Sequence, residues 1–72
     1  MLTNSPLLAR RVQTALEMHP NVPARQLRFE TSEGRVVLQG QVTSYYQKQM
    51  AQEALRRLDG VDQIDNQLVV HW

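Results

Sequence analysis

Cysteine is absent from this chain of 72 residues. Neither a disulfide framework nor a thiolate metal site can therefore form. Because a chain without cysteine is indifferent to the surrounding redox state, the absence leaves the compartment open. Internal repeats and low-complexity tracts are absent as well, and the length is enough for one domain. We expect a single domain over residues 1–72.

An excess of charge of either sign is also missing. Eight basic and seven acidic residues give a net charge of +1. A dedicated nucleic-acid binder shows a strong basic excess on one face, so this balance argues against a nucleic-acid partner. Hydrophobic residues make up 42% of the chain and charged residues 21%, which is typical of a soluble globular domain rather than a disordered one.

Long apolar runs are missing too. No run approaches the roughly 20 residues of a transmembrane helix, so we expect no transmembrane segment. The first residues, MLTNSPLLARRV, lack the basic-then-apolar order of a secretion signal. The sequence therefore predicts a cytoplasmic location if the chain is complete, or a domain excised from a longer protein.

Motifs for catalysis and metal binding are lacking. No nucleophile elbow, phosphate-binding loop or Ser/His/Asp set occurs, so we expect no enzymatic activity and no cofactor. His19 and His71 have no evident third ligand, whereas zinc requires three or four. The aspartates at 59, 62 and 65 recur every third residue, whereas a calcium loop alternates its ligands at every second position. We therefore expect no metal site.

Two helices are indicated by apolar periodicity. In the first, Ser5 is a suitable N-cap, Pro6 suits the first helical position, and Pro20 stops the helix. Its apolar face recurs at helical spacing and comprises Leu8, Val12, Ala15 and Leu16. The second begins after Ser44, which forms a capping box with Gln47. Its apolar face comprises Met50, Ala51, Ala54, Leu55 and Leu58, and we expect Gly60 to end it as a left-handed C′ residue.

Three strands are indicated by alternation. LRFETS (27–32) and RVVLQGQVTS (35–44) are separated by a tight turn containing Gly34 and predict an antiparallel hairpin. QIDNQLVVHW (63–72) predicts a third strand. Gly40 occupies an inward position of the second strand, where it predicts close approach of a helix through Ala51 and Ala54, or a bulge. A glycine that merely ends the strand is the alternative.

The order helix, strand, strand, helix, strand predicts an α+β fold. The second strand, second helix and third strand form a β-α-β crossover, so these two strands should be parallel. We expect a three-stranded mixed sheet with the second strand central and both helices on one face.

Several stretches, taken in order, resemble the BON domain family. These are GRVVLQGQVTS, then AQEAL in the second helix, then GVDQIDNQLVV. The matching positions are Val36, Leu38, Gly40, Val42, Ser44, Ala51, Ala54, Gly60, Val61, Ile64, Asn66, Leu68 and Val70. The first helix and the HPNV after it also match. The resemblance covers about Leu8 to Val70, and order and spacing carry it rather than any single motif.

The resemblance implies a domain that binds rather than catalyses. BON domains are associated with the bacterial cell envelope or periplasm, with phospholipid interfaces and with osmotic or other stress. They often occur beside other modules, which implies that this chain belongs to a larger multi-module protein. Sensing of a small ligand or ion is a further possibility that rests only on the stress association.

Exposed helix positions form the candidate binding surface. Tyrosine favours the membrane–water boundary, and lysine and arginine attract anionic lipid. We predict weak peripheral association with an anionic phospholipid surface through Leu7, Arg11, Tyr45, Tyr46, Lys48, Arg56 and Arg57. The alternatives are ordinary solvated helix faces, or a protein partner bound at an edge strand or at the open sheet face with Arg28, Val37, Gln39, Val69 and His71.

Overall fold

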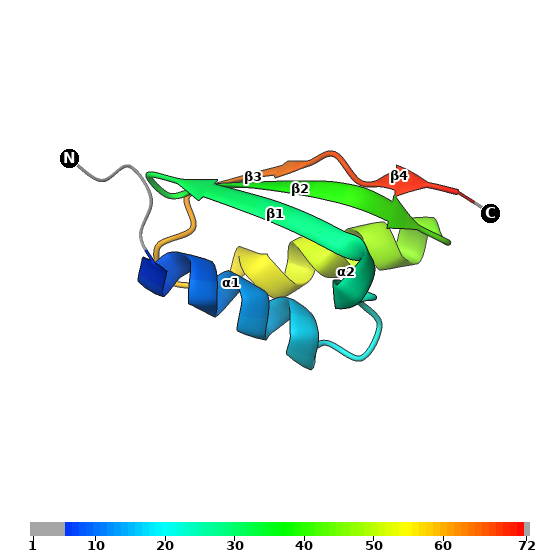
Figure 1. The fold of residues 1–72 in the computed structure, drawn as a ribbon, viewed down its shortest axis with the longest axis horizontal. Helices are drawn as coiled ribbons and strands as arrows, with labels where there is room; N and C mark the ends of the chain where they lie inside the picture. Colours follow the sequence, from blue (N-terminus) through cyan, green and yellow to red (C-terminus); the bar gives the residue numbers. More distant parts are fainter. Residues whose placement is uncertain (1–5, 72) are drawn as a thin grey trace.

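The structure, a computed structural model, describes residues 6–71 (Figure 1). The elements follow one another as α1 (Pro6–Met18), the short 3₁₀ helix η1 (Ala24–Gln26), β1 (Leu27–Ser32), β2 (Arg35–Val42), α2 (Tyr45–Arg56), β3 (Gln63–Asn66) and β4 (Val69–Val70). The expected N-cap Ser5 lies outside the described residues.

The sheet is mixed and β2 lies at its centre. β1 pairs with β2 antiparallel, and β3 and β4 both pair with β2 parallel. In Figure 1 the sheet lies above and both helices lie below it, so the helices cover one face and leave the other open. The predicted α+β class, strand order and one-sided helical layer are confirmed.

The core lies between the sheet and the helices. Its fully buried side chains come from the apolar faces of both helices, from the inward positions of β2 and from Leu68 between β3 and β4. Val12, Leu38 and Leu55 have no exposed surface. A domain of this size buries only about 60% of the surface of its unfolded chain, so each of these side chains contributes a large share of the stability.

The hairpin between β1 and β2 has the expected two-residue turn. Glu33 and Gly34 both take positive φ, at 51° and 87°, as a type I′ turn requires. Ser32 pairs directly with Arg35 across it. This turn fixes the register of the whole hairpin.

Gly40 has a different neighbour from the one predicted. A Cβ built on Gly40 would lie 2.6 Å from the carbonyl oxygen of Gln26 and 3.3 Å from the Cα of Leu27. The close approach therefore involves the backbone that leads from η1 into β1, and not Ala51 or Ala54 of α2. Gly40 also takes φ of +131°, which L-residues rarely adopt. The sequence pattern alone could not show whether the close neighbour of Gly40 is the start of the adjacent strand or a helix.

The last strand is divided in two, so the sheet has four strands rather than three. β3 pairs with β2 up to Asn66, and β4 resumes at Val69 with the same offset. Between them the N–H of Leu68, which points away from β2, donates to Oδ1 of Asn66 at 3.2 Å. The break lies opposite Gly40 of β2, which takes a positive φ.

Both ends of α2 differ slightly from the prediction. Oγ of Ser44 accepts from the N–H of Gln47 at 3.1 Å, which confirms the N-cap. The side chain of Gln47 accepts from the N–H and hydroxyl of Thr43 rather than from Ser44, so only half of the capping box forms. The helix ends at Arg56. Gly60, with φ of +95°, instead lies in the following turn, where the N–H of Val61 donates to the carbonyl of Leu58.

Candidate functional surfaces

The candidate apolar tips are all exposed on the helical layer. Leu7 in the first turn of α1 is 56% exposed, and Tyr45 and Tyr46 in the first turn of α2 are 60% and 54% exposed. Among the basic candidates, Arg11, Arg56 and Arg57 are exposed and Lys48 is half-buried. Burial therefore leaves these side chains available to a partner, Lys48 least so.

The seven candidates do not form one cluster, because α1 and α2 run in opposite directions (Figure 1). Near the start of α1, Nη1 of Arg11 donates to the carbonyl of Asp59 at 3.4 Å, just beyond the end of α2. After the end of α1, Nδ2 of Asn21 donates to the hydroxyl of Tyr46 at 3.4 Å, at the start of α2. Each end of the helical layer thus combines the start of one helix with the end of the other.

We call these two groups the basic end and the aromatic end. The basic end contains Leu7, Arg10, Arg11, Arg56 and Arg57, and the aromatic end contains Met18, Tyr45, Tyr46 and Lys48. Because a helix rises about 1.5 Å per residue, the starts of the two groups on α2 are roughly 17 Å apart along its axis. The candidate arginines therefore lie at the other end of the helical layer from the tyrosines, and Lys48 lies with the tyrosines.

Two of the basic candidates make further contacts: Arg56 forms an ion pair within α2, and the backbone of Lys48 bonds to the sheet. Nη1 of Arg56 lies 3.3 Å from Oε2 of Glu53, one helical turn earlier. The backbone carbonyl of Lys48 accepts from Nδ2 of Asn66 at 2.9 Å, which ties this turn of α2 to β3. Since both charged groups of the Arg56–Glu53 pair are largely exposed, the pair weakens the local positive charge without removing it.

Charge is divided between the two layers. Helices α1 and α2, together with the C-cap Arg57, carry five basic and two acidic residues, a net charge of +3. The rest of the chain carries three basic and five acidic residues, a net charge of −2. The small overall charge therefore conceals a helical layer that is distinctly positive.

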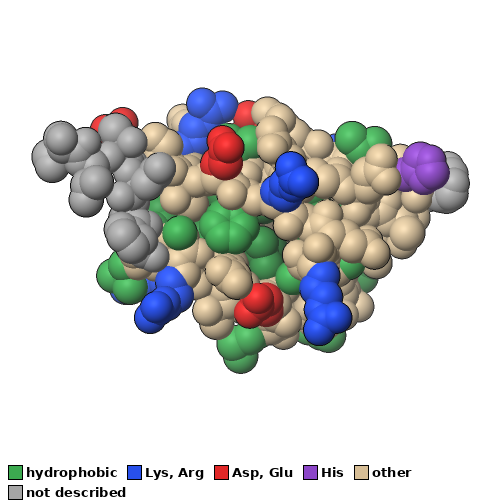
Figure 2. All heavy atoms as spheres, in the orientation of Figure 1, with side chains coloured by type: hydrophobic (Ala, Val, Ile, Leu, Met, Phe, Trp, Pro, Cys, Tyr) green, Lys and Arg blue, Asp and Glu red, His purple; other side chains and the backbone are tan. Residues whose placement is uncertain are grey.

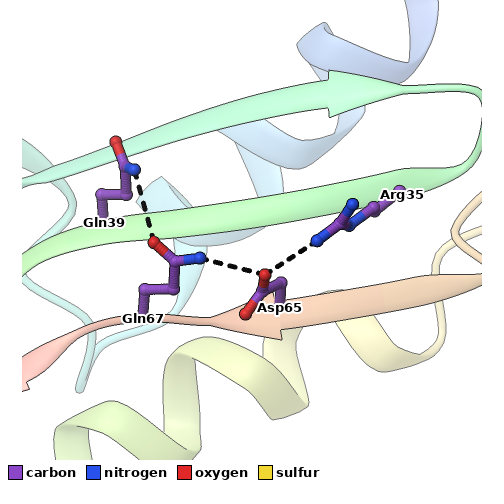
Figure 3. Close-up of polar contacts among 4 residues, drawn as sticks. All are labelled: Arg35, Gln39, Asp65 and Gln67. Carbon is purple, nitrogen blue, oxygen red and sulfur yellow. Dashed lines mark hydrogen bonds and ion pairs between the residues drawn. The ribbon is translucent and has the colours of Figure 1, made fainter.

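The open sheet face has a polar ladder across its strands (Figure 3). Nη2 of Arg35 lies 2.9 Å from Oδ2 of Asp65, which also accepts from Nε2 of Gln67 at 3.0 Å. Oε1 of Gln67 accepts in turn from Gln39 at 3.4 Å. Beside the ladder, Val69 is 55% exposed. The face is mainly polar, and Arg35, Gln39, Asp65 and Gln67 bond to one another there.

Sequence reasoning missed the roles of two residues. Arg10, exposed one position before Arg11, was not among the candidates although it adds to the basic end. Asn66 donates to the carbonyl of Lys48 and to Oε1 of Gln52, and it accepts from Leu68. Its position in the inward phase of the last strand was the signal, because a polar side chain facing the core must find partners.

Residues 6–71 lack the features of a metal site and of a membrane-spanning helix. In this part of the chain, no three histidine, aspartate or glutamate side chains gather as a metal site would require. Every buried side-chain nitrogen or oxygen there has a hydrogen-bond partner. Neither described helix has the length and apolar content needed to cross a bilayer.

The sequence pattern that defines the BON domain matches residues 4–71, nearly the whole chain. No curated protein gives a significant match to the sequence.

Proposed function

Because the chain belongs to the BON domain family, a family of binding domains, we propose that it binds anionic phospholipid surfaces weakly and peripherally. The outer face of α1 and α2 is the contact surface in this proposal. The observation that carries it is the division of charge, since the helical layer has a net charge of +3 and the rest of the chain −2. Such a dipolar domain turns its helices toward a negative surface.

Both ends of the helical layer contribute to the contact. α1 and α2 lie together beneath the sheet (Figure 1), so one flat surface against their outer sides reaches the basic end and the aromatic end. The arginines of the basic end attract lipid phosphates, and Leu7 inserts beside them. At the aromatic end, Tyr45 and Tyr46 place their rings at the headgroup level, and Met18, at 77% exposure, inserts shallowly.

The expected affinity is low for a single domain. Each basic residue near an anionic membrane contributes about 1 kcal/mol, and Glu17 and Glu53 on the same layer oppose part of that attraction. Useful affinity then requires several copies or a neighbouring domain on the same membrane, through effective concentration.

The test is co-sedimentation with vesicles at low micromolar protein. Phosphatidylcholine vesicles are compared with vesicles that also contain phosphatidylglycerol, over a series of salt concentrations. We expect recovery only with the anionic vesicles and a decrease with salt, because screening shortens the reach of surface charge. The double variant Arg56→Glu/Arg57→Glu should lower recovery without unfolding the domain.

A matched control separates position from net charge. Arg28→Glu/Arg35→Glu makes the same change in charge on the open sheet face and, like the test variant, removes one ion-paired and one unpaired arginine. It should leave recovery nearly unchanged. Equal recovery with neutral and anionic vesicles, or none with either at low salt, would exclude the electrostatic proposal and favour a protein partner at the sheet face or edge.

A further inference from the structure

The two edges of the sheet differ in how far they are open. The edge formed by β3 and β4 is interrupted where the N–H of Leu68 turns to Asn66. β1, at the other edge, is a continuous six-residue strand that, among residues 6–71, pairs only with β2. Natural edge strands are usually protected by proline, bulges or a covering element, and β1 contains neither a proline nor a break in its register.

The hydrogen-bond phase of β1 follows from that of β2. The carbonyls of Leu38 and Val42 accept from Gln67 and His71, so these positions of β2 face β3 and β4. The alternate positions of β2 therefore face β1 and bond to Arg28 and Glu30. Consequently the backbone groups of Leu27, Phe29 and Thr31 point to the open edge, except the N–H of Leu27, which donates to Ala24.

The outward side chains of β1 are self-complementary in charge. Arg28 and Glu30 lie on the open face, one on each side of Phe29, and their neighbours on β2 are the uncharged Gln39 and Val37. Neither has an ion-pair partner among the described residues. We propose that two copies of this domain pair antiparallel along β1, centred on Phe29, to form one continuous sheet.

In this arrangement each Arg28 lies opposite Glu30 of the second copy. The two Phe29 residues exchange a pair of hydrogen bonds, and the N–H of each Thr31 donates to the carbonyl of Leu27 in the second copy. The charged pairs occupy positions without backbone hydrogen bonds, where side chains approach most closely.

Charge also selects this register over its neighbours. A shift of two residues in one direction sets Arg28 against Arg28 of the second copy, and a shift in the other sets Glu30 against Glu30. Like charges directly opposite each other are destabilising. A shift of one residue sets the inward side chains of one β1 opposite the outward side chains of the other. Among these registers, only the one centred on Phe29 satisfies both constraints.

The underside of this edge has a hollow large enough for a side chain of the second copy. A hollow of about 120 Å³ lies between β1 and α1. Figure 2 shows hydrophobic side chains exposed in the middle of the face it depicts, between the sheet above and the helical layer below. The apolar lining comprises Leu16, Ala24, Leu27 and Phe29. Pairing about Phe29 brings the second phenyl ring over this hollow and removes apolar surface from water.

The predicted association is weak, because one strand edge buries much less than the roughly 800 Å² per partner of a standard interface. A two-fold axis perpendicular to the sheet places both helical layers on the same side. The dimer does not depend on lipid binding.

The test is sedimentation velocity over a concentration series up to millimolar, with charge-exchange variants. Arg28→Glu and Glu30→Arg should each weaken self-association roughly 5- to 50-fold, because two attractive pairs become repulsive. An equimolar mixture of the two variants should associate at least as well as the parent, since every charge then meets its opposite. The double variant Arg28→Glu/Glu30→Arg should associate like the parent.

Hydrogen exchange provides a readout of the register. Amide protection at Phe29 and Thr31 should rise with protein concentration, whereas the amides of Arg28 and Glu30, already bonded to β2, should not change. Arg57→Glu is the matched control, distant from the edge, and should leave association unchanged. A monomer at every concentration overturns the proposal. Association that the single reversals leave intact also overturns it, and so does association that they abolish but their mixture does not restore.

Discussion

Replacement of Gly40 by alanine tests the packing of the sheet most directly. The added Cβ would lie 2.6 Å from the backbone oxygen of Gln26, whereas real Cβ atoms essentially never come within 3.0 Å of such an atom. The backbone must therefore move by about 0.4 Å or more, and overpacking of this kind costs roughly 1–3 kcal/mol. The φ of +131° adds about 1–2 kcal/mol of conformational strain for a residue with a Cβ.

The expected loss is therefore about 2–5 kcal/mol of unfolding free energy. A domain of this size has a total of roughly 4–11 kcal/mol, so Gly40→Ala should remove a large fraction of it. The assay is urea unfolding followed by far-UV circular dichroism. In thermal unfolding the same loss corresponds to a decrease in Tm of at least about 10 °C.

Gly60→Ala is the control for this experiment. Gly60 also has positive φ, at +95°, but its added Cβ would meet only Cδ1 of Leu8 at 3.4 Å, an ordinary contact. This variant should lose the strain contribution alone, about 1–2 kcal/mol. If Gly40→Ala proved no more destabilising than Gly60→Ala, the argument from the Gln26 carbonyl would be refuted.

Three further substitutions follow from individual hydrogen bonds. Ser44→Ala should lower the unfolding free energy by about 1 kcal/mol, because the N–H of Gln47 loses its cap; an unchanged urea midpoint would contradict the capping role. Asn66→Ala should cost about 1–3 kcal/mol, because its partly buried hydrogen bonds to the carbonyl of α2 and to the last strand are lost. In this variant, amide hydrogen exchange should be faster in β4, where the last strand pairs with β2 after residue 66. Asp65→Asn should cost only about 0.2–1 kcal/mol, since its ion pair with Arg35 is solvent-exposed, and the difference should diminish in high salt; a larger, salt-independent loss would argue that the ladder is structurally important.

The helices and strands were predictable because each depends on short-range periodicity. Apolar residues at helical spacing, the Ser44 cap and the two-residue turn at Gly34 are local signals, and the structure has the elements they indicate. Strand order and the parallel pairing of β2 with β3 also followed, because the handedness of the crossover leaves few alternatives.

The details that failed are those in which distant segments meet. Gly40 was correctly placed in the inward phase, but its neighbour is Gln26, which only the path of the chain from η1 into β1 could determine. At the division of the last strand, the side chain of Asn66 bonds both to the backbone of α2 and to the N–H of Leu68. Such contacts depend on relative positions in space, which spacing along the chain does not encode.

The candidate contact surfaces likewise combine local features with features of the packed fold. The type of each side chain and the helix face that it occupies follow from the sequence. The packing of the elements makes α1 and α2 run in opposite directions and so separates the arginines from the tyrosines. It also decided that the helical layer has a net charge of +3, and that the backbone groups of Phe29 point to an open edge. The physical reason is that periodicity fixes directions within one element, whereas packing between elements fixes which of those directions share a surface.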